Sequence, residues 1–308
     1  MNYSDHSRDE NELINIIIGL TLPRSEFPHP FYDLGYELKA LEQSFINQQG
    51  NTVKPDLIIA NQKKGFLIIF EAKSGKNAEK IQLKNYQNIT EQDLVNNAGF
   101  KNIFVKNGFD VSYLCYRYTF LEEDKIAAFK NIIKSIEGNY SFPVLMYEKD
   151  VGYLSLKLNH FKDQEVNSLT ENIIKIPKNR IPQIIIFDQH SSIKELTPAT
   201  VQNIISYILE EKLEFTIEEL TNDILATYPG IETLIGSKTK KAVKNKIKRV
   251  MSNLKDKKPG YFKWKNEQQH WKINDDLKDP NYNQLNALRN MIGEKRKTAE
   301  GQMNIFES

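Results

Sequence analysis

Residues 55–73 read PDLIIANQKKGFLIIFEAK, and this stretch decides the fold of the first part of the chain. It holds two short apolar runs, at 57–60 and 66–70, separated by the turn-like sequence NQKKG at 61–65. Short runs rich in isoleucine with a glycine between them are typical of an antiparallel hairpin. We therefore expect two adjacent strands whose outer ends lie close together.

Three charged side chains stand at those ends. Asp56 precedes the first strand, and Glu71 and Lys73 close the second. Glu71 and Lys73 are two residues apart, so both side chains leave the same face of the strand. Two carboxylates in one place repel each other, and magnesium relieves the repulsion by bridging their oxygens. Such a metal polarises a phosphate and activates a water that Lys73 can orient or deprotonate. The set suits hydrolysis of a phosphodiester.

The E-x-K spacing also has an ordinary explanation elsewhere in the chain, as a solvated helix face. It recurs, in or beside predicted helices, at 37–39, 123–125 and 210–212. Only the copy at 71–73 ends an apolar strand, and Pro55-Asp56 is the only Pro-Asp in the sequence. These two facts favour a catalytic role for the charged residues of the hairpin over the alternative that they are ordinary surface residues.

Pro55-Asp56, followed fifteen residues later by Glu71-Ala72-Lys73, resembles the signature of the PD-(D/E)XK nuclease superfamily. The resemblance covers about residues 31–90. It implies a restriction-endonuclease-like α/β fold, with a mixed sheet flanked by helices. It also implies Mg²⁺, replaceable by Mn²⁺, held by the Asp and the Glu, with the Lys catalytic.

In that superfamily a glutamate from the preceding helix often completes the metal shell. Residues 34–48 are predicted to be this helix, because apolar residues recur at helical spacing. It offers Glu42 or, as the alternative, Glu37, and its periodicity does not choose between them. The spacing of Glu42 to Phe45 is similar to that in several members and favours Glu42.

Gln82 and Tyr86 form Q-x-x-x-Y in a helix predicted over 78–89. At i, i+4 they share one helix face. The pair resembles the motif that RecB-like branches of the superfamily place beside the active site to contact DNA, and we add both residues to the catalytic group. The alternative is an amphipathic helix with Tyr86 in the core.

Other chemistries fit the sequence poorly. Residues 230–239, GIETLIGSKT, superficially resemble a phosphate-binding loop, but the spacing is wrong and Ser237 is predicted to be a helix N-cap. Cys115, the only cysteine, lies in a predicted strand with no histidine nearby in sequence and is expected to be buried. The histidines are scattered and provide no zinc motif.

A length of 308 residues is enough for two domains, each with its own core. Strands mixed with helices predict one α/β domain over 31–190, after an N-terminal extension, 1–30. Its further elements are expected as strands at 111–118, 144–156 and 184–187 and a helix at 124–136.

The sequence pattern changes near residue 194, where signals for helices replace those for strands. Thr197 is predicted to cap a helix with Pro198 at its first position, and Thr216 with Glu219 has the spacing of a capping box. Helices are expected at 198–212, 217–226 and 237–257, followed by a hairpin over 261–273. Three helices closed by a hairpin are the order of a winged helix-turn-helix, which we assign to residues 194–275.

This second domain is strongly basic. Between residues 237 and 273 thirteen Lys and Arg face two acids, a net charge of +11, whereas the whole chain carries +2. We predict duplex DNA as its partner; the alternatives are a solvated surface or a dock for an acidic protein. The expected nucleic-acid contacts are Lys238, Lys241, Lys244, Lys248, Arg249, Lys263 and Lys265.

Residues 276–308 are polar and predicted to be flexible. Near their end Gln302, Ile305 and Phe306 form a peptide that resembles the one with which bacterial replication and repair proteins bind the β sliding clamp. An exposed segment with two apolar anchors suits a shallow groove.

The sequence therefore predicts a magnesium-dependent DNA endonuclease used in restriction or phage defence, transposition or repair. Rival interpretations are a subunit active only with a partner such as an ATPase, a catalytically silent DNA-binding regulator, and an RNA-directed nuclease. A polar N-terminus, a single cysteine and the lack of a long apolar segment predict a cytoplasmic protein with no membrane partner.

Overall fold

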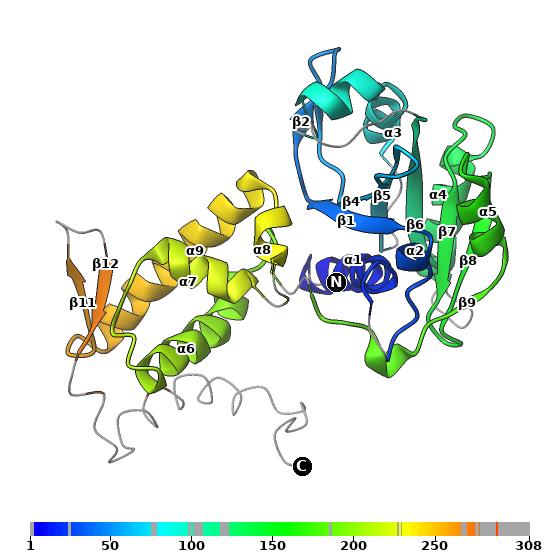
Figure 1. Cartoon of the computed structure of the whole chain (residues 1–308). Helices are drawn as coiled ribbons and strands as arrows, with labels where there is room; N and C mark the ends of the chain where they lie inside the picture. The colour runs from blue at the N-terminus through cyan, green and yellow to red at the C-terminus, as the bar shows by residue number, and fades with distance from the viewer. Residues whose placement is uncertain are drawn as a thin grey trace. The chain divides into compact units, whose positions relative to one another are not determined.

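The computed structural model describes residues 3–23, 26–74, 79–97, 100, 107–117, 123–184, 187–226, 228, 230–265, 270–274, 277 and 288. The chain forms two compact units (Figure 1). Unit 1 consists of Met1–Ile186 with Thr233–Lys238, and unit 2 of Phe187–Glu232 with Thr239–Ser308. The chain therefore leaves unit 1, returns to it for one short segment, and leaves again.

Unit 1 is built on a seven-stranded mixed sheet in the order β1-β4-β5-β6-β7-β8-β9. The β5–β6 and β6–β7 pairs are parallel and the other neighbours are antiparallel. The strands are β1 Tyr36–Leu41, β4 Leu57–Asn61, β5 Phe66–Lys73, β6 Phe109–Arg117, β7 Val144–Glu148, β8 Tyr153–Leu158 and β9 Ile174–Lys175. A separate small hairpin joins β2, Phe45–Ile46, to β3, Thr52–Val53.

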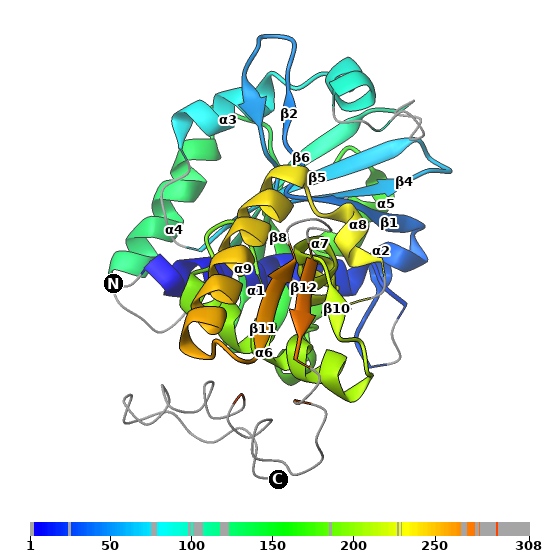
Figure 2. The ribbon, with the colours of Figure 1, turned by 90° about the vertical axis from the view of Figure 1, so that its left-hand side faces the viewer.

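Helices cover both faces of this sheet (Figures 1 and 2). One face of β5 packs through Leu67 and Ile69 in a core that also holds Leu83 and Ile132, from two helices. On the other face Phe70 meets Phe31 edge to face. The helices of unit 1 are α1 Tyr3–Leu20, α2 Pro30–Asp33, α3 Lys80–Gln87, α4 Glu123–Ile136 and α5 Gln164–Glu171, with short turns at Asp93–Asn97 and Lys178–Arg180.

The central hairpin has the predicted form. β4 and β5 pair antiparallel, with Leu57 opposite Phe70 and Asn61 opposite Phe66. Both strands are buried almost throughout. Their apolar runs are continuous rather than alternating because both faces of the sheet are covered. The predictions for α3, α4 and β6 are also confirmed to within a few residues.

The prediction of a helix over 34–48 is wrong. That segment forms β1 and β2, and β1 pairs with β4 along its length. Its apolar residues do fit a helical period, but the sheet pairing overrides that preference. Gly35, at φ +84°, separates α2 from the strand.

Three further expectations for unit 1 need correction. The strand predicted over 144–156 is two strands, since the chain turns at Gly152 with φ +71°. Helix α5 was not predicted, although Asp163 caps it through the amides of Glu165 and Val166. No strand includes Ile184 or Phe187, and residues 185 and 186 lie outside the described residues.

Unit 2 is a helical region with a small sheet of order β10-β12-β11. The second helix starts at the predicted capping box of Thr216 and Glu219. The first starts earlier than predicted, at a capping box of Ser192 and Glu195, so that Pro198 lies inside it. The elements of this part of the chain are α6 Ile193–Leu209, β10 Glu214–Phe215, α7 Ile217–Leu225, α8 Ile231–Leu234, α9 Ser237–Lys257, β11 Phe262–Lys265 and β12 His270–Ile273. The end of α8 and the start of α9 fall in the segment that belongs to unit 1.

None of the helices in the described part of the chain has the length and apolar character needed to cross a bilayer. Of the predicted tail, 276–308, only Leu277 and Leu288 are among the described residues, and both are buried. Gln302, Ile305 and Phe306 lie outside the described residues.

Candidate active site

The β4–β5 hairpin brings Asp56 and Glu71 together. The Asp56 amide donates to the Phe70 carbonyl at 3.2 Å, which continues the ladder past the end of β4. In return the Ala72 amide donates to Asp56 Oδ2 at 2.7 Å. The Asp56 carboxylate is therefore fixed to the backbone of the strand that carries Glu71 and Lys73.

Glu71 is the centre of the cluster, and its side chain is only 4% exposed. Three side chains donate to its carboxylate. Lys73 Nζ and Gln82 Nε2 each reach Oε1 at 2.6 Å, and the Tyr86 hydroxyl reaches Oε2 at 2.5 Å. The structure thus brings together all five residues of the predicted catalytic group.

The alternation of side chains along β5 explains this arrangement. Glu71 has the same parity as Leu67 and Ile69, so it leaves the sheet on the face covered by α3 and α4. Gln82 and Tyr86, four residues apart on α3, present one helix face to it. Both side chains donate to the Glu71 carboxylate, and the expected contact of these two residues with DNA stays a prediction.

Charges in this buried place perturb one another. Burial and the neighbouring Glu71 carboxylate raise the pKa of Asp56 well above its ordinary value, against the opposing effects of Lys73 and the Ala72 amide. Burial alone would lower the pKa of Lys73, but the carboxylates of Glu71 and Asp56 raise it above its ordinary value. Lys73 is therefore held as an ammonium ion beside Glu71 and Asp56.

Glu42, rather than Glu37, lies next to this pair. The Glu42 amide donates to the Asp56 carbonyl at 2.8 Å, and the Glu42 carboxylate contributes to the raised pKa of Asp56. Glu42 follows β1 instead of lying in a helix, and its side chain is paired with Lys54 at 3.3 Å. Glu37 is on the same strand but exposed, and it pairs with Lys39 at 2.6 Å.

Glu10 is a further acidic residue near the cluster, and no sequence motif predicts it. This residue lies on α1, the helix that precedes the sheet, and its Oε1 accepts from the Ser74 amide at 3.3 Å and from the Ser74 hydroxyl at 3.2 Å. It also contributes to the raised pKa of Lys73. No local motif marks a contact between residues 64 positions apart.

The donor set can be tested for a hard cation. Each carboxylate oxygen offers about two lone pairs. Glu71 Oε1 already receives two donors, whereas Glu71 Oε2 and Asp56 Oδ2 receive one each. Oxygen lone pairs therefore remain on both residues, and they are the ligand type that Mg²⁺ prefers. Within the described ranges, no three His, Cys, Asp or Glu side chains form a ready-made metal cluster.

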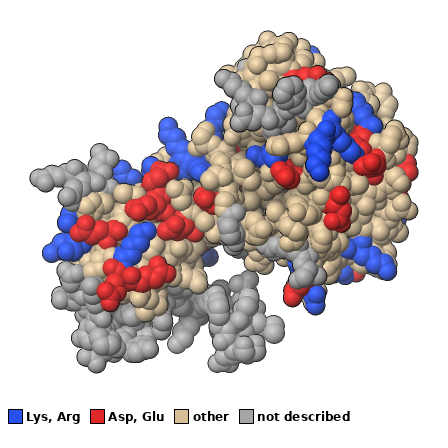
Figure 3. All heavy atoms as spheres, in the orientation of Figure 1, with Lys and Arg blue, Asp and Glu red and all other residues tan. Residues whose placement is uncertain are grey.

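The basic residues of α9 and β11 separate into two groups. On α9, four of the predicted nucleic-acid contacts are exposed and have no acidic partner among the described residues: Lys238, Lys241, Lys248 and Arg249. Lys244 and Lys265 are instead paired with Glu218 and Glu214, and Lys263 is exposed on β11. Figure 3 shows acidic as well as basic side chains on the face of unit 2 that it draws, so the unit is not basic all round.

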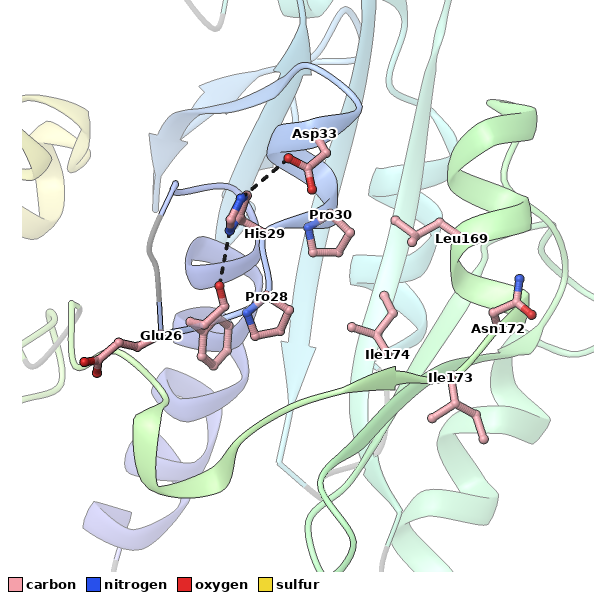
Figure 4. Close-up of a pocket in the computed structure, with 10 residues that line it drawn as sticks. Glu26, Pro28, His29, Pro30, Asp33, Leu169, Asn172, Ile173 and Ile174 are labelled. Carbon is pink, nitrogen blue, oxygen red and sulfur yellow. Dashed lines mark hydrogen bonds and ion pairs between the residues drawn. The ribbon is translucent and has the colours of Figure 1, made fainter.

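A groove of about 630 Å³ in unit 1 shares no residue with this cluster (Figure 4). The segment that carries His29 and the segment from α5 to β9 line it. Its only titratable residues are Glu26, His29 and Asp33, of which His29 pairs with Asp33 at 3.6 Å. These groups do not form the combination of carboxylates and cation found at Glu71.

Comparison with known proteins places the first unit in a family. The model of the MJECL32 domain matches residues 9–186. The chain belongs to the MJECL32 domain family. The matched region of this domain begins on α1 and ends where unit 1 first gives way to unit 2.

The chain is similar to the Uncharacterized protein MJECL32 of Methanocaldococcus jannaschii, with 28% identity over 191 residues. The alignment covers 54% of this chain and 39% of that protein. No solved structure matches the chain. The MJECL32 domain contains the whole Asp56–Glu71–Lys73 cluster, together with Glu10 and Glu42.

The raised pKa of Asp56 predicts how stability depends on pH. Because the folded state holds the Asp56 proton more tightly than the unfolded chain, the wild type should gain stability as pH falls through the raised pKa toward the ordinary value of about 4. Asp56→Asn should raise the free energy of unfolding by about 1 kcal/mol at pH 7 in EDTA. The difference in free energy of unfolding between Asp56→Asn and the wild type should become smaller at lower pH, because Asp56 of the folded wild type is then protonated. Thermal unfolding followed by circular dichroism measures both, and a less stable Asp56→Asn at pH 7 would contradict the prediction.

Two tyrosines that contact each other test the hydrogen bond to Glu71. Tyr86→Phe removes a donor to a buried carboxylate and should lower the free energy of unfolding by about 1.5–3 kcal/mol. The matched control is Tyr113→Phe. The Tyr113 ring meets Tyr86 at 6.2 Å, but its buried hydroxyl has no partner in the described part of the chain. That control should be neutral or stabilising in urea unfolding, and equal losses in the two variants would refute the role of the hydroxyl.

Proposed function

We propose that this chain is a metal-dependent nuclease that hydrolyses phosphodiester bonds in duplex DNA. The observation that carries the proposal is the cluster at Glu71. Two acidic side chains and an ammonium group meet at the ends of β4 and β5, where burial opposes the charged forms of Asp56 and Lys73. Perturbed groups brought together at this cost are typical of functional sites.

Each residue has a distinct part in the proposed reaction. Asp56 and Glu71 would hold Mg²⁺ or Mn²⁺, with Glu42 or Glu10 as the further acid. When bound, the metal would polarise the scissile phosphate and activate water. Lys73, kept protonated by its neighbours, orients the attacking water and offsets negative charge on the phosphate. Gln82 and Tyr86 fix the Glu71 carboxylate.

The fold of unit 1 supports a place in the PD-(D/E)XK superfamily. A mixed sheet covered by helices, with the candidate acids on adjacent central strands, is what the sequence resemblance implies. The element order after residue 192 supports a winged helix-turn-helix, because α6, α7 and α9 precede the β11–β12 pair, with β10 and the short α8 between them. In that assignment α9 is the recognition helix and β11–β12 the wing.

The exposed side of α9 supports duplex DNA as the substrate. Lys241, Lys248 and Arg249 project from the side opposite to the buried positions Val243, Ile247, Val250, Met251 and Leu254. A helix with one apolar and one cationic face can pack on its own unit while contacting phosphates.

The cleavage reaction itself is the first test. Pure protein with supercoiled plasmid should nick or linearise it in Mg²⁺ or Mn²⁺ and not in EDTA. Lys73→Ala should lower the rate by about 10²-fold or more, because it removes stabilisation of developing charge. Agarose gels over a time course measure the rates.

A matched control is available on the same sheet. Lys39 also lies two residues after a glutamate on a strand and pairs with it at 2.6 Å, as Lys73 does with Glu71. Lys39→Ala should cut at the wild-type rate. Equal rates in Lys73→Ala and wild type would disprove the proposed site. A wild type that binds DNA but does not cut it would favour a partner-dependent subunit or a silent regulator.

DNA binding by α9 should depend on those exposed cations that have no acidic partner in the described ranges. Each phosphate contact contributes about −0.9 to the slope of log affinity against log salt on duplex DNA. Lys241→Ala combined with Lys248→Ala should therefore reduce the slope by about 2 and weaken binding in low salt. Fluorescence anisotropy with a labelled duplex at several salt concentrations measures this.

The control pair for that experiment is Lys244→Ala combined with Lys265→Ala. These two lysines already have acidic partners in Glu218 and Glu214, so their removal should change the slope less. A larger effect from the paired lysines than from the unpaired ones would place the DNA on another surface.

A further inference from the structure

The segment Thr233–Lys238 belongs to unit 1, although the residues on both sides of it belong to unit 2. It lies along β1. Ile235 forms a parallel bridge with Leu41, the last residue of that strand, and the Gly236 amide donates to the Leu41 carbonyl at 2.7 Å. A segment almost two hundred residues further along the chain thus pairs with the outer side of β1.

Gly236 is the point of closest approach. It is buried, and a Cβ atom at this position would lie 2.2 Å from the Glu42 carbonyl oxygen and 2.9 Å from the Glu42 carbonyl carbon. Real Cβ atoms do not come that close to backbone, so any larger residue would have to displace the chain at Glu42. Close backbone approach is a recognised reason for glycine at a position.

The backbone that Gly236 contacts is unusual. Glu42 has φ +48°, which L-residues other than Asn, Asp and His seldom adopt. Such a conformation persists only when surrounding contacts fix it. Two contacts fix Glu42. Its amide donates to the Asp56 carbonyl, and Gly236 packs closely against the Glu42 carbonyl group. Its side chain is 12% exposed.

We propose that Ile235 and Gly236 position Glu42 in the candidate active site. The segment closes the outer side of β1 and fixes the turn at which the Glu42 amide donates to the Asp56 carbonyl. Gly236 is a positioning residue that acts through Glu42. The site is thus completed from outside residues 9–186, the region matched by the family model. This inference rests on the proposed metal-dependent function for its effect on catalysis, but not for its structural claim.

The glycines of the chain provide a matched pair of variants. Gly236→Ala introduces a Cβ against the Glu42 backbone, whereas Gly260→Ala introduces one with nothing within 4 Å and no positive φ. A misplacement of about 1 Å in an active site costs about 10²-fold in rate. Plasmid cleavage by Gly236→Ala should therefore fall by about tenfold to 10²-fold. Gly260→Ala should cleave like the wild type.

Metal binding gives a readout that does not require turnover. Calorimetric titration with Mn²⁺ alone should show affinity about 10- to 100-fold weaker in Gly236→Ala, the range seen when groups that orient metal ligands are lost. Duplex DNA affinity should stay within about twofold in both variants, because the α9 cations are unchanged. Wild-type Mn²⁺ affinity and cleavage in Gly236→Ala would overturn the proposal.

A double-mutant cycle separates action through Glu42 from general disruption. If Gly236 acts through Glu42, adding Gly236→Ala to Glu42→Ala should cause no further loss of cleavage or Mn²⁺ affinity. Additive losses would overturn the proposal, because Gly236 would then act through another group.

Amide hydrogen exchange on the wild type covers the case in which Gly236→Ala does not fold. The Gly236 amide, bonded to the Leu41 carbonyl, should be protected as strongly as the amides of β1. Rapid exchange at Gly236 would overturn the proposal whatever the variants do. If the wild type cuts no DNA, the nuclease proposal fails. Hydrogen exchange at Gly236 and calorimetric titration with Mn²⁺ then still decide whether this segment positions Glu42.

Discussion

The pairing of β4 with β5 is the constraint on which the rest of unit 1 depends. It fixes Asp56 to the Ala72 amide and so sets the distance between the two acids of the cluster. Because these strands are central, they are covered on both faces and carry continuous apolar runs. The same burial that stabilises the sheet makes the charges at its end expensive, and Lys73, Gln82 and Tyr86 offset that cost at Glu71.

What could be predicted from the sequence is what local signals encode. The hairpin follows from two isoleucine-rich runs around a glycine, and α7 follows from its Thr216–Glu219 capping box. The grouping of Gln82 and Tyr86 follows from their i, i+4 spacing. Their target does not follow, since a helix periodicity shows which residues share a face and not what that face meets.

The predictions fail where contacts between residues far apart in the sequence determine the structure. Residues 34–48 fit a helix by spacing, yet β1 forms because the edge of β4 is available to it. Glu10 could not be identified because its partner, Ser74, is 64 residues away and no motif records the contact. The contact of Gly236 with Glu42 is more distant still. In each case the deciding partner lies far along the chain, beyond the reach of a local pattern.

The pairing of Ile235–Gly236 with Leu41 also has a consequence for solubility. A strand whose outer N–H and C=O groups are unpaired is a template for another chain, and proteins usually protect such strands. At the opposite side of the sheet β9 is only two residues long, which is one form of protection. At β1 the protection comes from residues after position 230. A proteolytic fragment ending near residue 186 would keep its core but uncover the end of β1, and two such fragments could join edge to edge into oligomers or aggregates.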